Sequence, residues 1–397
     1  AGSGALCDRS GMKVLHVISS NAVIHGGPSR ALALMEQSLS RLGVDIVTAT
    51  TDDAGRGRHN GKSLGVPLHE NGVTRRYFRK QMDFYKTSLG LGWWTLRHAR
   101  DFDVVHIHAL FSFNTLVAAW SARLAGVPYV IRPLGTLNHY GVTHRRPWLK
   151  RASLALLEGP ALRGAAAVHF TSEAEQQEAA QWGVPMRGVV IPLGIEPAPQ
   201  ADAALVRARY PALGMAPYVL FLSRLDPKKN VEGALLAFAQ VLPSWPGLRM
   251  LMAGDGDPTY VAKLHGTAAE LGLGESVVWA GRIDGDLKAS ALFSAKLFVL
   301  PSFSENFGIA AAEALMAGLP CVLGQGVAIA GDVVRAGAGV AVAPDPASIA
   351  AGLRQVLADE SGRAAMGAAA LRLAQARYSA QAMGQNLLQL YSEILER

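Results

Sequence analysis

Cysteines, long apolar runs and metal-ligand motifs are all scarce or missing in this chain. Only two cysteines, Cys7 and Cys321, occur in 397 residues and they lie far apart, so we expect a reducing cytosol and no disulfide framework. No Cys/His pattern has the spacing of a structural zinc site. No apolar run reaches the roughly 18 residues of a spanning helix, and the first eleven residues lack the apolar segment of a signal peptide. We therefore predict a cytoplasmic location.

Charge is also sparse, at 17% of residues against 50% hydrophobic, which is typical of a globular protein with large buried sheets. The net charge of +7 resides in the first half, where it is concentrated in two clusters: Arg75, Arg76, Arg79 and Lys80, then Arg145, Arg146, Lys150 and Arg151. Interleaved aromatic residues make an anionic membrane surface one interpretation. A solvated basic face is the other, and nucleic acid is not expected because no recognition motif accompanies the charge.

Short apolar runs alternate with helical segments along the chain, in two successive sets. The first set is Lys13–Ile18, Asp45–Thr50, Asp103–Ile107, Pro128–Arg132, Ala166–Phe170 and Gly188–Pro192. A proline-containing linker over 194–217 follows. The second set is Tyr218–Ser223, Leu248–Ala253, Ser276–Ala280, Leu297–Pro301, Pro320–Leu323 and Val340–Val342. Apolar strands alternating with helices predict parallel sheets covered on both faces.

This alternation predicts two doubly wound α/β domains, covering residues 12–195 and 196–378. The last segment, 379–397, has the apolar spacing of an amphipathic helix. The pattern leaves open whether that helix caps the second domain or crosses back to the first. Ligands of open parallel sheets bind beyond the carboxyl ends of the strands, so two such domains predict a ligand cleft where they face each other.

The most informative stretch is PSFSENFGIAAAEALMAG, residues 301–318. A strand ends here, a loop carries Glu305, and strong helix formers begin after Gly308. The unpaired N–H groups at a helix start, with the helix dipole, form an anion site. Glu305 and Glu313 on either side suit a ligand with hydroxyls flanking its phosphates, such as a nucleotide sugar. The alternative is that these glutamates only complement the helix dipole.

The second motif, SRLDPKKN at 223–230, follows the strand Tyr218–Ser223 and carries Arg224 and Lys229. Cations at a strand's carboxyl end can hold a diphosphate and stabilise it as a leaving group. A solvated surface loop is the alternative interpretation. Arg282 and Ile283, after the strand Ser276–Ala280, are candidates for contacting the nucleotide base.

Two further motifs belong to the first domain. Gly26 and Gly27 in SNAVIHGGPSRAL allow the chain to pass close to donor phosphates, although a plain tight turn explains them as well. In DVVHIHALFS, His106 and His108 alternate on a strand and point the same way. His108 lies at the carboxyl end and is the functional candidate, whereas His106 fits a core histidine.

Asp-x-Asp triplets hold a metal ion in some sugar transferases. They occur here at Asp101/Asp103, Asp255/Asp257 and Asp284/Asp286. Their flanking sequences are those of strand starts and glycine-containing turns, so we interpret them as turn chemistry and predict no metal or other cofactor.

Taken together, these motifs resemble the GT-B glycosyltransferases, and in particular the large retaining family 4, over nearly all of residues 12–397. The resemblance rests on the Glu305/Glu313 pair, the Arg224/Lys229 pair, the MAGDGD turn at 252–257, the glycine loop at 26–27, DVVHIHA and HFTSEAE. Two positions depart from the family pattern. Asn230 follows the lysine where glycine is frequent, and Leu193-Gly194 stands where Asn-Gly is frequent.

The resemblance implies roles for individual residues. Glu305 would contact the donor sugar, Glu313 the ribose, and Arg224 and Lys229 the diphosphate, with His108 near the reacting sugar. The remaining donor-binding candidates are Asn306, Phe307, Gly308 and Ile309, the last two through backbone N–H groups. It also implies retention of anomeric configuration and a final helix that crosses to the first domain.

Residues 131–175 resemble bacterial polysaccharide and O-antigen transferases, which implies a UDP- or GDP-linked hexose donor and a glycan or polyprenyl-diphosphate-linked acceptor. This places the protein, as an expectation, at the inner face of the plasma membrane in cell-surface polysaccharide synthesis. The alternatives are a GT-B epimerase or hydrolase acting on a nucleotide sugar, and a non-catalytic nucleotide-sugar-binding protein.

Overall fold

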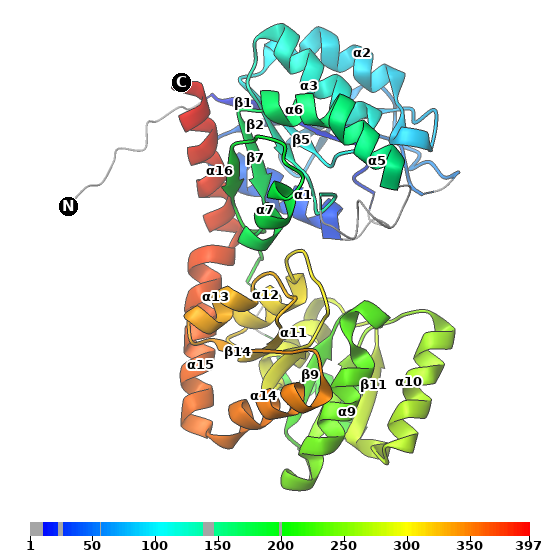
Figure 1. The fold of residues 1–397 in the computed structure, drawn as a ribbon, viewed down its shortest axis with the longest axis vertical. Coiled ribbons are helices and arrows are strands. Elements are labelled where there is room, and N and C mark those ends of the chain that lie inside the picture. The colour runs from blue at the N-terminus through cyan, green and yellow to red at the C-terminus, as the bar shows by residue number, and fades with distance from the viewer. Residues whose placement is uncertain (1–10, 23–26, 56, 138–146, 198–200) are drawn as a thin grey trace, which may run out of the picture. The chain divides into compact units, whose positions relative to one another are not determined.

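A computed structural model describes residues 11–22, 27–55, 57–137, 147–197 and 201–397 of the chain. It contains two compact units, one comprising Ala1–Gly194 with Ala380–Arg397 and the other Ile195–Ser379 (Figure 1). Each unit has its own sheet with helices on both faces. The predicted α/β class with two doubly wound sheets is therefore confirmed.

The sheet of the first unit has eight strands in the order β3-β4-β2-β1-β5-β6-β7-β8. All neighbouring pairs are parallel except β3 with β4. The chain runs outward from β1 in one direction and returns to the other side of β1 with β5, which makes the β1/β5 boundary the switch point of the sheet. The strands are β1 (Lys13–Ile18), β2 (Asp45–Thr51), β3 (Pro67–Glu70), β4 (Val73–Phe78), β5 (Val104–His108), β6 (Tyr129–Arg132), β7 (Ala167–Phe170) and β8 (Gly188–Val190).

Helices cover this sheet, and two separate apolar cores lie between the sheet and its helices. One core lies under α1 (Gly27–Arg41) and α16 (Ala380–Leu395), through residues such as Met35 and Leu387. The other lies under α2 (Leu89–His98), α3 (Phe113–Ala125), α6 (Gly159–Gly164) and α7 (Glu173–Ala180). The α5 helix (Pro147–Ser153) continues through a π-helical stretch, Leu154–Glu158, into α6. The final helix thus packs in the first unit, and Gly194 permits this because a Cβ there would lie 2.7 Å from the Ala380 Cα.

The second unit has a six-stranded parallel sheet in the order β11-β10-β9-β12-β13-β14. Its switch point lies between β9 and β12, because the chain leaves β9 in one direction and returns at β12 to go the other way. The strands are β9 (Tyr218–Leu222), β10 (Arg249–Ala253), β11 (Val277–Gly281), β12 (Leu297–Leu300), β13 (Cys321–Gly324) and β14 (Gly339–Val342).

The central strands of this sheet are buried on both faces, as a parallel sheet between helix layers requires. On one face α14 packs beside α9 and against β13 and β14, and elsewhere in the unit α12 packs on α15. The helices are α8 (Ala203–Arg209), α9 (Val231–Val241), α10 (Pro258–Glu270), α11 (Gly285–Ser294), α12 (Ile309–Met316), α13 (Ala330–Arg335), α14 (Pro346–Ala358) and α15 (Glu360–Leu373). No helix of the described residues is long and apolar enough to cross a membrane.

The hairpin β3–β4 is absent from the sequence prediction, which interpreted 75–80 as a surface cluster of basic residues. Arg75 instead lies on β4, mostly buried, and its guanidinium pairs with Glu36 and with Glu70. Lys80 is also buried and pairs with Asp53 at 2.7 Å and Asp83 at 2.6 Å. These two cations are therefore part of an internal ion-pair network, and both the membrane and the solvated-face interpretations are wrong for them.

Candidate functional site

The residues predicted to hold a diphosphate lie at the switch point of the second unit's sheet. Arg224 and Lys229 follow β9, and Glu305 follows its neighbour β12. Because the strands are parallel, their carboxyl ends share one edge, which is where ligands of doubly wound sheets bind.

Lys229 and Glu305 meet directly. The Lys229 Nζ donates to Glu305 Oε1, and both side chains are largely withdrawn from solvent. The Ser302 hydroxyl also donates to that oxygen, at 3.3 Å. The Glu305 backbone is fixed as well, since its N–H donates to the Gly326 carbonyl at 2.9 Å. Arg224 lies nearby in sequence and is exposed. The pair brings a carboxylate and a cation, 76 positions apart in sequence, to one point.

Gly308 is the N-cap of α12 and has φ 95°, in the left-handed region that glycine favours. A Cβ here would lie 2.9 Å from the Val327 Cγ1. Gly308 has no side chain that could cap this helix. The N–H groups of the first turn, beginning at Ile309, have the arrangement predicted for an anion site.

Asn230 shows why one departure from the family pattern is tolerated. It has φ 56°, ψ 46°, and asparagine is among the few non-glycine residues that adopt this conformation readily. Its side-chain amide donates to the carbonyls of Pro344 at 2.7 Å and Pro301 at 3.2 Å. Asparagine therefore replaces glycine here without changing the turn, and it ties the Lys229 loop to the end of β12.

The MAGDGD turn supports the same loop from the other side. Cβ atoms at Gly254 and Gly256 would collide with the backbone oxygens of Ser223 and Leu225. The Leu225 N–H donates to the Asp255 carbonyl at 2.7 Å. These glycines thus allow the close approach that positions Arg224.

Glu313 lies one turn into α12 and accepts a hydrogen bond from the Lys288 Nζ at 2.7 Å. Lys288 belongs to α11 and was missed at the sequence level, because a lysine inside a helix carries no motif. It places a cation beside the predicted ribose carboxylate.

The other donor-binding candidates differ in exposure. Arg282 is well exposed after β11 and lies 3.7 Å from Asp284. Asn306 is exposed, whereas Ile283 and Phe307 are buried. Phe307 packs edge-on against Tyr378, with ring centroids 5.6 Å apart. Ile283 and Phe307 therefore shape the site by packing, and Arg282 is accessible to a ligand.

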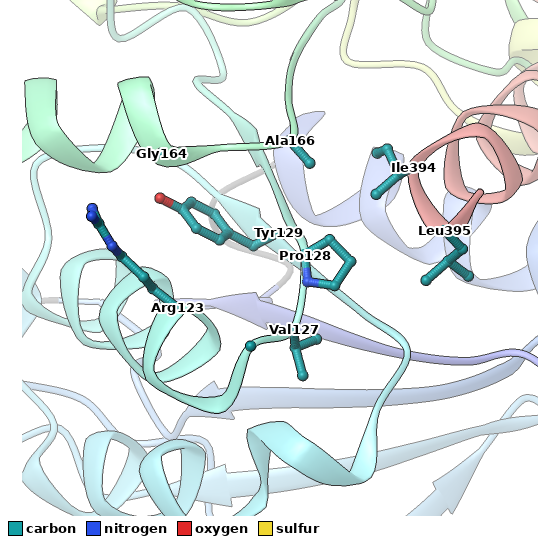
Figure 2. A pocket seen from close by; sticks show the side chains of 9 residues that line it. Arg123, Val127, Pro128, Tyr129, Gly164, Ala166, Ile394 and Leu395 are labelled. Carbon is teal, nitrogen blue, oxygen red and sulfur yellow. The ribbon is translucent and has the colours of Figure 1, made fainter. Parts of the chain in front are cut away.

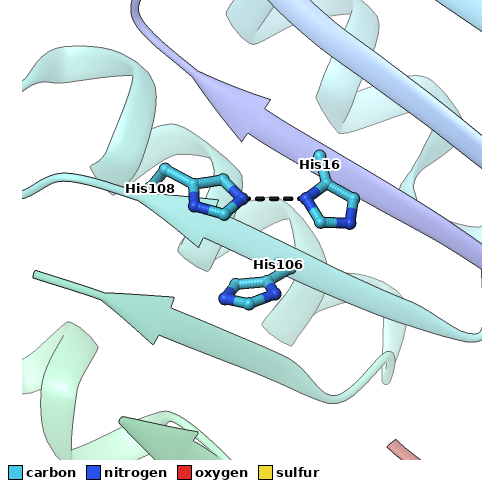
Figure 3. Close-up of side chains that lie close together, drawn as sticks. All are labelled: His16, His106 and His108. Atoms are coloured by element: carbon cyan, nitrogen blue, oxygen red, sulfur yellow. Dashed lines mark hydrogen bonds between the residues drawn. The ribbon is translucent and has the colours of Figure 1, made fainter. Parts of the chain in front are cut away.

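In the first unit, His108 is the last residue of β5 and lies at the β1/β5 switch point. It is buried, and its Nε2 lies 2.8 Å from His16 Nδ1 of β1 (Figure 3). Gly27 begins α1 after the same strand, and Gly26 lies outside the described residues. The predicted position of His108 at the carboxyl edge is thus observed, but His16 was not foreseen as its partner.

His106 and His169 continue a buried histidine row. The Nδ1 of His106 lies 2.7 Å from the Tyr391 hydroxyl of α16, and His169 Nε2 lies 2.8 Å from the Ile191 carbonyl. Burial lowers the pKa of His16 and of His169 to about 3 and holds those of His106 and His108 well below the usual range. The charge of Arg132 acts in the same direction. All four imidazoles are therefore neutral near pH 7.

The cluster of His16, His106 and His108 has the composition of a metal site but a different geometry. Ligand nitrogens of the three lie within 4.8 Å of one another. However, the rings of His16 and His108 are stacked with an interplanar angle of 12°, and those of His106 and His108 with 23°. Imidazole lone pairs lie in the ring plane, so stacked rings do not converge on one ion (Figure 3). The charge of Arg132 also opposes a cation.

Two of the Asp-x-Asp residues accept hydrogen bonds from backbone N–H groups. Asp257 caps α10 by accepting from Thr259 and Tyr260 N–H groups, and Asp103 accepts from the Lys13 N–H at 2.7 Å. Asp284 is the N-cap residue of α11. These observations agree with the turn interpretation.

Sequence reasoning also missed Glu158, which is buried beside the β5 loop. Its Oε1 accepts from the Tyr85 hydroxyl at 2.6 Å and from the Phe111 N–H at 3.0 Å. Burial raises the pKa of Glu158 to about 7. A glutamate inside a helical segment carries no sequence signal that it is buried and hydrogen-bonded.

A pocket is lined by Val127, Pro128, Ala166, Ile394 and Leu395 of the first unit (Figure 2). It borders Tyr129, the first residue of β6, whereas the predicted site residues follow the last residues of their strands. It is therefore not part of the candidate site.

Two family models match the sequence of this chain. Residues 205–372 match the model for glycosyl transferases group 1, and residues 26–194 match the glycosyl transferase 4-like domain. The chain belongs to the group 1 glycosyltransferases. The two matched ranges fall in the second and first units respectively.

Curated relatives of this glycosyltransferase chain are similar over about half of it. A phosphatidyl-myo-inositol mannosyltransferase of Mycobacterium leprae is 30% identical over 231 residues, covering 56% of this chain and 55% of the relative. An alpha-monoglucosyldiacylglycerol synthase of Streptococcus pneumoniae is 28% identical, covering 55% and 51%. The chain thus spans about half the length of these relatives.

Solved glycosyltransferase structures match nearly the whole chain in fold. Anabaena Alr3699/HepE in complex with UDP has a TM-score of 0.77 at 20% identity, with 96% of this chain and 100% of that chain covered. Sucrose-phosphate synthase from Thermosynechococcus elongatus has a TM-score of 0.75 at 20% identity, covering 97% and 99%. At such identities the likeness supports the GT-B fold alone.

Proposed function

We propose that this protein transfers a hexose from a UDP- or GDP-sugar to an acceptor hydroxyl with retention of anomeric configuration and without a metal. The observation that carries the proposal is the Lys229–Glu305 pair at the β9/β12 switch point, beside the uncapped start of α12. It combines a cation, a carboxylate and an anion-binding helix start, which together match a diphosphate joined to a sugar.

In this proposal the second unit binds the donor. Arg224 and Lys229 hold the diphosphate with the first N–H groups of α12, and they stabilise the negative charge that develops as the nucleoside diphosphate leaves. Glu305 accepts hydrogen bonds from the sugar hydroxyls, and Glu313 from the ribose. In the first unit, His108, which is neutral because of its burial, is proposed to bind a substrate hydroxyl.

Nucleotide binding tests the donor class. The full chain is heated with UDP, GDP, ADP or CMP, each with EDTA. A ligand at 100 times its dissociation constant adds about 2.7 kcal/mol to the stability of the fold, which is a readable rise in Tm. We expect UDP or GDP alone to stabilise the protein. Stabilisation that depends on added metal would contradict the metal-free part of the proposal, and no shift with any nucleotide would contradict the donor site.

A lipid-linked acceptor is the second part of the proposal. One of the relatives above is named for a lipid that it glycosylates, phosphatidyl-myo-inositol, and the other for a lipid that it makes, alpha-monoglucosyldiacylglycerol. In the first unit, α2 exposes Leu89, Trp93 and Leu96 on one face, and α3 exposes Trp120 and Leu124.

These five residues, called here the tryptophan surface, are accompanied by arginines. The Arg97 guanidinium lies 4.3 Å from the Trp93 ring centroid, and that of Arg123 lies 5.7 Å from the Trp120 centroid. The two helices pack side by side. Tryptophan with adjacent arginine is typical of the interface between headgroups and acyl chains, so we propose that this surface holds the protein on an anionic membrane.

Liposome flotation tests the tryptophan surface. Vesicles with about 30% anionic phospholipid should float a larger share of the wild-type protein than vesicles of neutral lipid do. The double variant Trp93→Ser/Trp120→Ser should lose most of this binding, whereas Met215→Ser, at an exposed methionine of the second unit, should not. Equal flotation of the double variant, or no preference for anionic lipid, would contradict this surface.

A further inference from the structure

The buried guanidinium of Arg132 lacks the hydrogen bonds that such a group requires. Arg132 is the last residue of β6, only 1% exposed, and it pairs in register with His108. Neither its Nε nor its Nη1 has a partner among the described residues. Burial lowers its pKa to about 10, so it stays charged at neutral pH. A buried charge that is not paired is strongly destabilising, which calls for a compensating group.

Glu175 is the acidic group whose charge acts on Arg132, but its oxygens accept hydrogen bonds from other donors. Oε1 accepts from the Gly135 N–H at 2.6 Å, and Oε2 accepts from the N–H and the hydroxyl of Thr171 at 2.7 and 2.8 Å. Glu175 therefore fixes the loops after β6 and β7, and it does not hydrogen-bond the guanidinium.

Two unpartnered imidazole nitrogens belong to the neighbouring strands β1 and β5. His108 Nδ1 and His16 Nε2 are buried without a hydrogen-bond partner, while their other nitrogens bond to each other. A shift of tautomer along this pair makes His108 Nδ1 either a donor or an acceptor. With Nδ1 protonated, His108 and Arg132 together present three unpartnered donor nitrogens and one positive charge.

The backbone after both strands is also unusual. Ala109 has φ 72° directly after His108, and Leu134 has φ 57° two residues after Arg132. Both are left-handed, which is costly for alanine and leucine. The Ala109 N–H donates to the Arg132 carbonyl at 2.9 Å, so the two strand ends are locked together. Strain of this kind is concentrated at ligand sites.

We propose that Arg132, with His108, binds an anionic oxygen group of a substrate, a phosphate or a carboxylate, at the carboxyl ends of β5 and β6. Oxygen anions match the chemistry because each accepts several N–H bonds and neutralises the buried charge. Within the proposed glycosyl transfer, on which this assignment of a substrate rests, the group comes either from the acceptor or from the donor. Arg132 then determines specificity by favouring a charged substrate over a neutral one.

The test uses the full chain and inorganic phosphate, pyrophosphate and acetate as probes, at ionic strength matched with sodium chloride. We expect phosphate or pyrophosphate to raise the Tm of the wild-type protein, and to raise it much less in Arg132→Gln. Arg132→Lys, which keeps the charge but not the fork, should retain part of the shift. Equal shifts in wild type and Arg132→Gln would overturn the proposal, because general salt stabilisation would then explain them.

Adding UDP or GDP, whichever binds, distinguishes an anionic group of the acceptor from one of the donor. If the group belongs to the acceptor, the Tm shifts caused by phosphate and by the nucleotide should add. If it belongs to the donor, the two ligands should compete and their Tm shifts should not add. Nucleotide stabilisation that persists in Arg132→Gln, together with loss of the phosphate shift, separates this site from the Lys229 site. If no nucleotide binds the wild type, the proposed transfer fails, while the phosphate comparison still decides whether Arg132 is an anion site.

A purely structural role for Arg132 has a different signature. The ¹⁵N NMR signals of the histidine side chains report their tautomers, and phosphate should change those of His108 and His16 in the wild-type protein but not in Arg132→Gln. Unchanged imidazole signals at saturating phosphate would overturn the assignment. Arg132→Met should fold at least as stably as the wild type, because it removes a buried charge whose bonds are not made. A large loss of Tm in Arg132→Met would instead show that the guanidinium is held by the fold itself.

Discussion

Glu305→Gln should lower the rate of sugar transfer by about 100- to 1,000-fold, the range for removing one group that stabilises a transition state electrostatically. The carboxylate now accepts from Lys229 Nζ and the Ser302 hydroxyl, so it is fixed in place before any sugar binds. Glutamine keeps the shape but not the charge. The transfer rate is measured as release of nucleoside diphosphate from a sugar donor of the nucleotide that stabilises the protein most. Vesicles containing phosphatidylinositol or diacylglycerol serve as acceptors.

The nucleotide affinity of Glu305→Gln should change little or rise, because Lys229 is then no longer neutralised and remains available to the diphosphate. Lys229→Met should do the reverse and weaken UDP or GDP binding by about 10- to 100-fold, as expected for a lost charge-assisted bond. Glu360→Gln is the matched control, since Glu360 is an exposed carboxylate at the start of α15 in the same unit. A full transfer rate in Glu305→Gln would remove this residue from the site.

The places of the proposed donor-site residues in the fold could be predicted from the sequence because each residue follows a strand whose apolar run is easy to recognise. Arg224 and Lys229 come directly after β9, and Glu305 after β12. Their meeting could not be predicted from spacing. It depends on strand order, which places β12 beside β9 although β10 and β11 lie between them in sequence. The resemblance to a family supplied that information, and the sheet shows its physical basis.

Other contacts had no local signal. Lys288 reaches Glu313 from the middle of α11, and Arg75 is buried because Glu36 of α1 and Glu70 of β3 neutralise it. A basic run with aromatic neighbours looks the same in sequence whether its charges face water or carboxylates. Arg132 is different, because it ends the predicted strand Pro128–Arg132. The rule that selected His108, a polar residue at a carboxyl strand end, applies equally to Arg132.

Acid should unfold the first unit with a midpoint on the order of pH 5. In the unfolded chain a histidine takes up a proton near pH 6.5. In the fold His16 and His169 do so only near pH 3, and His106 and His108 also well below their usual pKa. Between these values the unfolded state binds more protons, so stability is full above pH 6.5 and falls as the pH falls. At pH 5 His16 and His169 each cost about 2 kcal/mol. His106 and His108 act in the same direction, whereas Glu158, whose pKa burial raises to about 7, offsets part of the loss.

Hydrogen exchange at pH values from 4 to 8 measures this unit by unit. Peptides from β1, β5 and β7 should lose protection together as the pH falls, before those from β9 and β12. His169→Gln removes one of the four titrating groups and should make the stability of the first unit depend less steeply on pH. His265→Gln should leave it unchanged, because His265 is exposed on α10 of the second unit. Protection of β5 that persists at pH 4 would contradict this prediction, because the unit would then withstand the proton uptake of the unfolded chain.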